Sequence, residues 1–286
     1  MKKKGHSANG KRATPFASAW KALLAVAVFG LAFGVVGCGK KSRSSSSSSE
    51  RESSSSESRI ETKVCALPGG VKLEMVHVEP GSFVMGDDQI GDKRRERITE
   101  GFWIGKFEVT QAQWEAVMGN NPSEFKGADL PVEQVSWDDC KRFLKKLNAL
   151  PAVKESGLVF RLPTEKEWEY ACRAGSTGDY CKLADGTEII ERTLGEVAWY
   201  DDNSEGKTHP VGQKKPNAFG LYDMHGNVWE WCEDLYQAGY SFRVYRGGSW
   251  RSDSSYCTAG YRDNFNPFYR INYLGFRLAA FQDVNR

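Results

Sequence analysis

The sequence lacks several features that would place it in a common functional class. It has no Cys-x-x-Cys pair, so the usual ligand spacing of a structural zinc site is missing. It has no basic excess in its main part, because residues 38–286 hold 33 basic and 37 acidic side chains; nucleic acid is therefore not an expected partner. It has no visible internal repeat. Its longest apolar run, residues 22–37, is shorter than the roughly 20 residues of a membrane-spanning helix.

The first 37 residues lack acidic side chains and carry six Lys or Arg before their apolar run. The run ends in Val35-Val36-Gly37-Cys38, which looks like a bacterial lipobox. We predict a lipoprotein signal peptide over 1–37 and a lipidated Cys38 that anchors the protein to a lipid bilayer. An uncleaved membrane anchor is the alternative. Either one places the rest of the chain outside the cytoplasm, in the bacterial cell envelope.

A Ser-rich stretch follows Cys38 and has little that could be buried, which is typical of a flexible tether. We therefore divide the chain into the signal peptide (1–37), the lipidated Cys and tether (38–63), and one domain (64–286). The domain contains six cysteines, at positions 65, 140, 172, 181, 232 and 257. An even number in an exported domain suggests disulfides, but six cysteines allow fifteen pairings and the spacing does not choose among them.

Secondary structure is predicted mainly in the first half of the domain. Three helices are expected after Thr110, Ser136 and Thr164, each of which stands three residues before a Gln, Asp or Glu, as in a capping box. Strand patterns cover 71–78, 82–86, 101–110, 242–246 and 275–280, and the charged stretch 87–97 is expected to be a surface loop. Beyond Cys172 the chain is mostly loops with Gly, Asn, Pro and aromatic residues. The predicted fold class is α+β with low regular secondary structure and many ordered loops.

The loop 217–234 contains the densest chemistry of the sequence. Two carboxylates, Asp223 and Glu230, bracket a Gly-Asn turn, and tryptophans flank the second carboxylate. Carboxylates and backbone carbonyls together form the oxygen shell that calcium prefers. The alternative is a tight turn whose acids face water or an arginine. The spacing leaves both open.

Seven motifs follow one another between about residue 71 and residue 280: Gly-Ser-Phe-Val-Met-Gly (81–86), Phe-Glu-Val-Thr (107–110), Pro-Val with Val-Ser-Trp (131–137), Arg-Leu-Pro-Thr-Glu-Lys-Glu-Trp-Glu-Tyr (161–170), the loop 217–231, Arg-Gly-Gly-Ser-Trp (246–250) and Leu-Gly-Phe-Arg (274–277). In this order they resemble the formylglycine-generating enzyme (sulfatase-modifying factor) family. The resemblance implies a variant of the C-type-lectin fold. It also implies a calcium site formed by Asp223, Gly226, Val228 and Glu230.

The family activity implied by the resemblance is the copper- and O₂-dependent oxidation of a substrate cysteine, in a sulfatase-like protein, to formylglycine. Counting from the Gly-Gly-Ser motif, the second copper-binding cysteine of the family falls on Cys257 and the first falls on Ser252, which is not a thiol. Trp229 and Ser249 match residues that line the oxygen pocket. The candidate catalytic residues are therefore Cys257, Ser249 and Trp229.

A second alignment, anchored on Arg262 and the Leu-Gly-Phe-Arg motif, shifts the count by about three residues. It places Cys257 near a cysteine that the family uses structurally, which implies a disulfide between Cys172 and Cys257. The catalytic cysteine pair is incomplete in either case, so the sequence leaves open whether the protein is an enzyme.

Three functions compete at this point. The first is the formylglycine-type oxidase. The second is a non-catalytic binding or scaffold module that displays the lectin-like fold at a membrane and contacts another envelope protein. The third, an iron-dependent sulfoxide synthase built on the same domain, needs a His-rich iron site, whereas the domain has only the widely spaced His77, His209 and His225.

Overall fold

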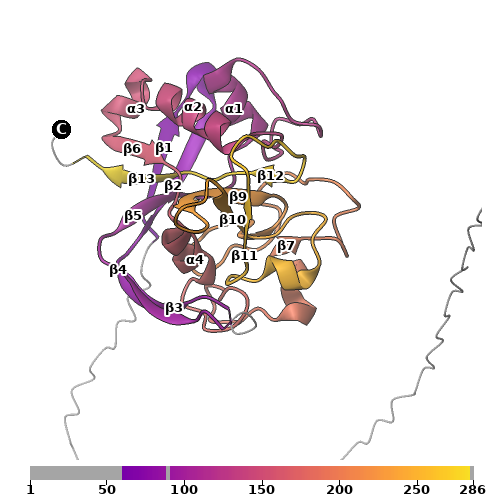
Figure 1. Cartoon of the computed structure of the whole chain (residues 1–286). Coiled ribbons are helices and arrows are strands. Elements are labelled where there is room, and N and C mark those ends of the chain that lie inside the picture. Colours follow the sequence, from indigo (N-terminus) through magenta and orange to yellow (C-terminus); the bar gives the residue numbers. More distant parts are fainter. Residues whose placement is uncertain (1–59, 88–90, 284–286) are drawn as a thin grey trace, which may run out of the picture. The chain divides into compact units, whose positions relative to one another are not determined.

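The computed structural model describes residues 60–87 and 91–283 (Figure 1). The predicted signal peptide, Cys38 and most of the tether lie outside these residues. The helices are α1 (Gln111–Met118), α2 (Trp137–Leu147), α3 (Pro151–Glu155) and α4 (Glu165–Arg173). The strands are β1 (Thr62–Ala66), β2 (Lys72–Val78), β3 (Gly81–Met85), β4 (Arg94–Ile98), β5 (Phe102–Gly105), β6 (Leu158–Arg161), β7 (Ala198–Trp199), β8 (His225–Gly226), β9 (Trp229–Leu235), β10 (Arg243–Arg246), β11 (Arg262–Phe265), β12 (Leu274–Gly275) and β13 (Ala279–Gln282). Within the described part of the chain, none of the helices has the length and apolar character needed to cross a bilayer.

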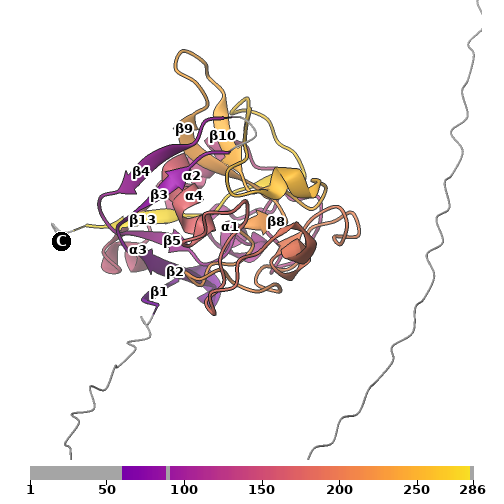
Figure 2. The same cartoon turned by 90° about the horizontal axis from the view of Figure 1, so that it is seen from below.

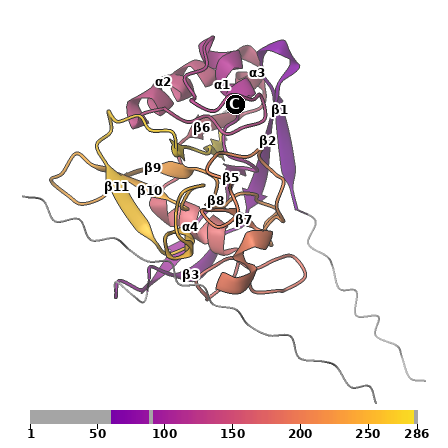
Figure 3. The same cartoon turned by 90° about the vertical axis from the view of Figure 1, so that its right-hand side faces the viewer.

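Two sheets carry the fold. The five-stranded sheet has the order β1-β2-β5-β13-β6, and all its neighbouring strands are antiparallel. The four-stranded sheet has the order β11-β10-β9-β12, with β12 parallel to β9. Two small pairs, β3-β4 and β7-β8, complete the set. In Figure 3 the long β1-β2 pair runs along one side of the domain, away from the four-stranded sheet.

The three predicted helices begin at their predicted caps. The side chains of Thr110, Ser136 and Thr164 each accept a hydrogen bond from the backbone N–H three residues later, and the side chain at that position bonds back to the cap. Each box satisfies two backbone donors that a helix start otherwise leaves unpaired. The capping prediction is confirmed for all three.

The five-stranded sheet is buried on both faces. On one face Leu73 and Met75 of β2 pack in a core with α1, α2 and α3. On the other face Val76 and Val78 pack with Trp168 of α4. This alternation follows from the two-residue period of a strand. Figure 2 shows α4 between this sheet and the strands β3, β4, β9 and β10, all of which it contacts.

Three expectations need correction. The charged stretch expected to be a loop contains β4, an exposed strand paired with β3 in which only Ile98 is buried, so it carries no apolar alternation to detect. The loop 217–234 is partly strand, because β8 and all but the last residue of β9 lie within it. The strand expected over 101–110 ends at Gly105. The α+β class is confirmed.

Candidate functional site

The predicted catalytic segment is the connection between β10 and β11. It starts with Gly247 and Gly248, both with positive φ, and ends in a 3-10 turn, Ser254–Cys257, that Asp253 caps through the N–H of Ser255. A Cβ atom at Gly248 would overlap the Sγ atom of Cys257. The glycine therefore permits both the backbone turn and the close packing of the cysteine against it.

Ser249, Ser252 and Cys257 lie together, as the alignment on the Gly-Gly-Ser motif predicts. The Ser249 N–H donates to Ser252 Oγ at 3.0 Å and also faces the Cys257 sulfur. The hydroxyl oxygens of Ser249 and Ser252 are 3.0 Å apart. The Ser249 N–H thus faces both side chains that stand at the copper positions of the family, the Cys257 thiol and the Ser252 hydroxyl.

Cys257 is fully buried. Burial raises the pKa of its thiol to about 12, the carboxylates of Asp201 and Asp253 add to the shift, and the Ser249 N–H opposes it. At neutral pH the metal-free side chain is therefore a thiol, and nucleophilic attack or metal binding would first have to remove its proton.

The predicted Cys172–Cys257 disulfide is absent from the structure. All six cysteines of the described residues are free and buried. The Cys172 sulfur instead lies 3.6 Å from Nε2 of His225 and 3.6 Å from the Met224 carbonyl oxygen. The disulfide expectation therefore needs correction, because the imidazole of His225 is the direct neighbour of that sulfur.

His225 connects the cysteine segments without being charged. Its Nδ1 lies 2.7 Å from the Cys257 carbonyl oxygen, and its Nε2 accepts from the Cys181 N–H at 3.1 Å. Burial, as the largest cause, lowers the pKa of His225 to about 4. The ring is therefore neutral, carries its proton on Nδ1 and acts as a structural bridge between three chain segments.

Trp229 and Cys257 pack in different clusters of buried side chains. The Trp229 ring packs against Tyr245 at 4.9 Å and Tyr261 at 5.9 Å, within the larger core cluster, whereas Cys257 belongs to a separate cluster with Tyr180 and Leu194. Of the three candidate catalytic residues, the structure brings two together and assigns the third to the core.

The loop 217–234 places its acids around an arginine. Both Glu230 oxygens receive hydrogen bonds from Arg277, at 2.7 and 3.0 Å from its Nε and 2.7 Å from its Nη2, and Trp168 Nε1 donates to Oε2 at 2.6 Å. Both side chains are almost fully buried. With Arg277 and Trp168 bound, Glu230 presents no free oxygen to an ion, so the arginine alternative describes this residue. Chelation tests whether the loop as a whole binds calcium.

Two further buried carboxylates surround this ion pair. Glu108 accepts from the N–H of Val228 at 3.0 Å and from the Asn227 amide at 2.6 Å, while Asp223 Oδ2 accepts from the N–H of Gly212 at 2.7 Å. The second oxygen of Asp223 has no partner. Burial and neighbouring carboxylates raise the pKa of Glu108 well above its usual range, and burial raises that of Asp223 to about 6.

The role of Arg277 was not predicted from the sequence, although Glu108 and Arg277 both lie in motifs of the family pattern. No periodicity could have paired them with the loop, because Arg277 follows Glu230 by 47 residues and Glu108 precedes Val228 by 120.

Within the described residues, no group of three or more His, Cys, Asp or Glu side chains is arranged to hold a metal ion.

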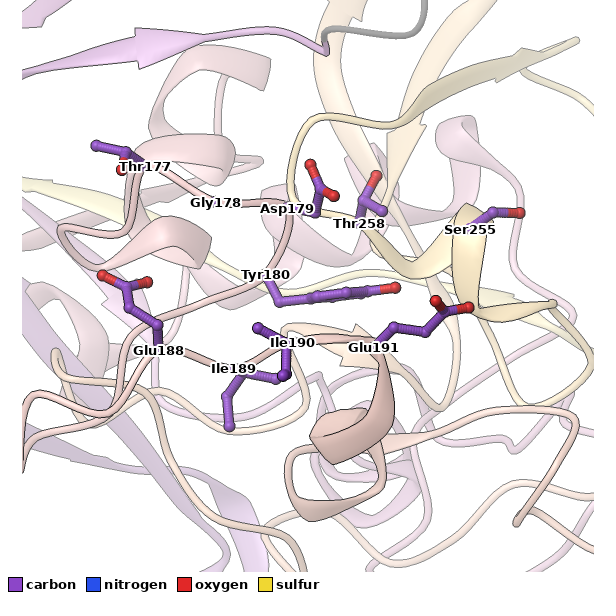
Figure 4. Close-up of a pocket in the computed structure, with 10 residues that line it drawn as sticks. All are labelled: Thr177, Gly178, Asp179, Tyr180, Glu188, Ile189, Ile190, Glu191, Ser255 and Thr258. Atoms are coloured by element: carbon purple, nitrogen blue, oxygen red, sulfur yellow. The ribbon is translucent and has the colours of Figure 1, made fainter.

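A cavity of about 460 Å³ opens beside the catalytic segment (Figure 4). Ser255 and Thr258 contribute one wall, and residues 177–180 and 188–191 contribute the others. The Tyr180 hydroxyl donates to the Ser254 carbonyl oxygen at 3.1 Å, which fixes the wall to the segment. The cavity is therefore next to the turn that buries Cys257, but Cys257 does not line it.

Comparison with known proteins extends over the whole domain. Residues 68–281 match the family described as "Sulfatase-modifying factor enzyme 1-like domain". The chain is 32% identical to "Chaperone protein LppX" of Paenibacillus barcinonensis, over 71% of this chain and 88% of that protein. It is 31% identical to the formylglycine-generating enzyme of Thermomonospora curvata, over 71% of this chain and 69% of that protein.

Two more similarities bear on activity and fold. "Inactive C-alpha-formylglycine-generating enzyme 2" of Bos taurus is 31% identical, over 70% of this chain and 66% of that protein. The solved structure of Treponema denticola variable protein 1 is 32% identical and superposes with a TM-score of 0.66, over 76% of this chain and 98% of that one. The predicted family and its fold are thus confirmed.

Proposed function

The chain belongs to the sulfatase-modifying factor enzyme 1-like family, and from this premise we propose that it is a non-catalytic protein-binding module held at a membrane by its N-terminal segment. The single observation that carries the proposal is the state of Cys257. It is a fully buried thiol whose neighbour at the other copper position is the hydroxyl of Ser252.

Copper does not fit the residues present. The family chemistry, as the resemblance implies, holds copper between two thiolates, and soft Cu(I) selects thiolate ligands. Ser252 offers a neutral, hard oxygen that already accepts the Ser249 N–H, so only one thiol stands at the two positions. No oxidation step can therefore be derived from this pair.

The relatives support a role without catalysis. The chain is as similar to a protein named an inactive formylglycine-generating enzyme as it is to a named active one, so family membership is compatible with either. A further relative, of which the match covers 88%, is named a chaperone protein. That name supports the proposal that this chain, too, binds other proteins.

The surface next to the catalytic segment supports protein binding as well. Tyr256, Phe268 and Tyr269 are 44%, 69% and 56% exposed, on the loops that flank β11. Large exposed aromatic side chains are enriched at protein interfaces, since they bring much contact area at a small cost in conformational entropy. We call the two loops that flank β11, residues 251–261 and 266–273, the binding loops.

Membrane attachment completes the proposal. The lipobox-like run before Cys38 and the Ser-rich stretch after it support a lipid anchor with a tether, which would present the domain to other proteins of the bacterial cell envelope. The bilayer is then the first partner and an envelope protein the second.

The catalytic half of the proposal is tested with a peptide that carries Cys-x-Pro-x-Arg. Full-length protein, loaded with Cu(I) and supplied with O₂, is incubated with the peptide, and aldehyde formation is followed by mass spectrometry. We expect no conversion, while the Thermomonospora curvata enzyme in parallel serves as the positive control. Copper-dependent conversion by this protein would overturn the proposal and make Cys257 a catalytic thiol.

The binding half is tested by photo-crosslinking from defined positions. A photoreactive residue is placed at Tyr256, at Phe268 or, as a control, at Lys145 on the exposed side of α2. In intact cells we expect discrete protein adducts from the binding loops and none from position 145. Equal labelling from all three positions would contradict a dedicated binding face.

A further inference from the structure

Strand β1 has an open outer edge. It is an end strand of the five-stranded sheet and, among the described strands, it pairs only with β2. Figures 2 and 3 both show it as the outermost strand on its side of the domain. Helix α3 also contacts β1, but on the face where Cys65 shares a core cluster with Val153. The edge that faces away from β2 therefore has no described strand beside it.

Two hydrogen bonds show which backbone groups of β1 point outward. The His77 N–H donates to the Glu61 carbonyl oxygen at 2.9 Å, and the Leu67 N–H donates to the Val71 carbonyl oxygen at 2.8 Å. In an antiparallel pair, residues that bond the neighbouring strand alternate with residues whose N–H and C=O groups point away from it. The odd-numbered residues of β1 therefore bond β2, and the even-numbered residues face outward.

The outward residues are Thr62, Val64 and Ala66. All three side chains are exposed, and Val64 is 58% exposed. Their backbone donors and acceptors point away from β2, toward a side where no other described strand lies. The edge thus offers three N–H and three C=O groups in a row, with an aliphatic side chain at its centre.

Natural sheets usually protect such an edge with a proline, a bulge or an outward-pointing charge. β1 contains no proline and pairs with β2 in one continuous register. Its single charged side chain, Lys63, is turned onto the sheet: the ammonium donates to Gln282 Oε1 at 2.5 Å and lies 4.7 Å from the centre of the Trp103 ring. None of these three protections is therefore present on β1.

We propose that β1 pairs antiparallel with β1 of a second copy of this chain, so that two five-stranded sheets join into one. In the register centred on Val64, the two Val64 residues lie opposite each other, and each Thr62 lies opposite an Ala66. Each of these pairs exchanges two backbone hydrogen bonds, so about six form in total. On the other face Lys63 lies opposite Cys65, so no like charges are directly opposed.

A second copy fits this edge better than an unrelated strand. The exposed row is complementary to itself, because aliphatic and neutral side chains meet in every directly opposed pair. The proposed lipid anchor would hold all copies at one membrane, which raises their local concentration. That matters because a single pair of strands is a small interface compared with the roughly 1,600 Å² of a stable complex. The inference goes beyond the proposed function, and the binding loops stay uncovered because they flank β11 in the other sheet.

The first test is crosslinking in intact cells. Full-length protein with Val64→Cys is treated with a short, membrane-permeant bis-maleimide, while the native cysteines of the domain are buried. We expect a crosslinked dimer, because the two new thiols would face each other. Ser82→Cys, at an exposed position of β3, is the control and should stay monomeric. No dimer from Val64→Cys, an equal yield from Ser82→Cys, or an adduct with another protein in place of the dimer would overturn the proposal.

The second test uses the direction of the Val64 N–H. Energy transfer between full-length copies that carry donor or acceptor dyes on C-terminal tags is measured in the membrane. Val64→Pro removes an outward donor and leaves the hydrogen bonds between β1 and β2 intact, so the melting temperature should stay close to that of the parent while energy transfer falls to background. Parent-level energy transfer in Val64→Pro would overturn the pairing.

The third test asks whether the edge meets its own copy in this register. Val64→Glu and Val64→Lys each place two like charges opposite each other, so each variant alone should pair about tenfold more weakly. Coexpression of the two variants places opposite charges there, and energy transfer between them should recover. Ser82→Glu is the control and should behave like the parent. Absence of recovery in the mixed pair would overturn the proposal. The protein-binding module would stand in that case, because its own test probes the binding loops and not β1.

Discussion

Arg277 and Glu230 form a buried pair in which the guanidinium bonds both carboxylate oxygens, at 2.7–3.0 Å, while its Nη1 donates to the carbonyl oxygen of Gly105 and its Nη2 also donates to that of Tyr222. Neither side chain is more than 1% exposed. The pair joins the loop 217–234 to the end of β5 and to the segment before β13, so it fixes the centre of the domain.

Replacing Arg277 by Met should destabilise the protein by about 3–5 kcal/mol, because it leaves Glu230 buried without a countercharge next to two other acids. Urea unfolding measures the change. Lys141→Met, which removes the ammonium of a half-exposed pair with Glu233, is the matched control and should cost less than about 1 kcal/mol. If both variants lose a similar free energy of unfolding, the buried Arg277–Glu230 pair contributes no more to stability than the half-exposed pair does.

Calcium removal tests the other interpretation of the same loop. Because Arg277 already satisfies Glu230, we expect the melting temperature of the protein to be the same with a chelator and with added calcium. An ion bound only to the native state at a hundredfold excess over Kd would add about 2.7 kcal/mol. A melting temperature that falls on chelation would restore the calcium prediction, with the unpaired Asp223 Oδ1 as its first ligand to examine.

The raised pKa of Asp223 predicts that the free energy of unfolding falls as the pH rises. Its pKa is raised from an ordinary 3.8 to about 6, so the folded state holds its proton more tightly than the unfolded state does. That contribution is fully present below about pH 4 and is lost as the pH rises to about 6, a change on the order of 3 kcal/mol.

The Asp223→Asn variant isolates this effect. Its amide oxygen can still accept from the Gly212 N–H, and it carries no titrating group, so the decline between about pH 4 and pH 6 should flatten. Asp129→Asn, at an exposed position, is the control and should follow the parent. Identical pH profiles of the free energy of unfolding in parent and Asp223→Asn would rule the effect out.

Ser252→Cys should create the missing half of a copper site. The new sulfur would lie beside Cys257, since the Ser249 N–H faces both positions. Two neighbouring thiols bind Cu(I) far more tightly than one, so we expect a gain in affinity against a chromogenic Cu(I) chelator. Ser254→Cys, on the exposed side of the same turn, is the control. No gain in Ser252→Cys over this control would show that Cys257 is too deeply buried for metal.

Cys38→Ala tests the anchor. Without the lipid-bearing cysteine, radiolabelled fatty acid should no longer enter the protein, and membrane fractionation should show it released or retained as an unprocessed precursor. Cys65→Ala, inside the domain, is the control and should keep its label. If Cys38→Ala is labelled and partitions like the parent, the lipoprotein prediction is wrong.

The sequence predicts the parts of this fold that depend on neighbouring residues. The three capping boxes are local, and so they mark α1, α2 and α4 correctly. Contacts between distant segments leave no such pattern. Arg277 meets Glu230 across 47 residues, and the His225 ring meets the Cys257 carbonyl across 32, so neither the arginine alternative nor the neighbour of Cys172 could be chosen from spacing.

The candidate site, too, combines contacts within one short segment with contacts between distant segments. Ser249, Ser252 and Cys257 meet within one short turn, so a motif alignment can place them near each other, whereas the surroundings of Trp229 depend on Tyr245 and Tyr261 from two other segments. The cavity gave no signal either, because its walls come from separate segments, residues 177–180, 188–191 and 255–258, that meet only in the folded chain.

The position of β13 has a consequence for how the protein is made. This strand follows every other element along the described chain, yet it lies between β5 and β6 inside the five-stranded sheet. While the ribosome is still working, β6 has no neighbour and the sheet cannot close. The five-stranded sheet is therefore completed only after β13 has been made, although β5 and β6 emerge much earlier. By the same logic, a stop codon shortly before Ala279 would remove the strand that pairs with both β5 and β6 and leave an unpaired edge on each of them.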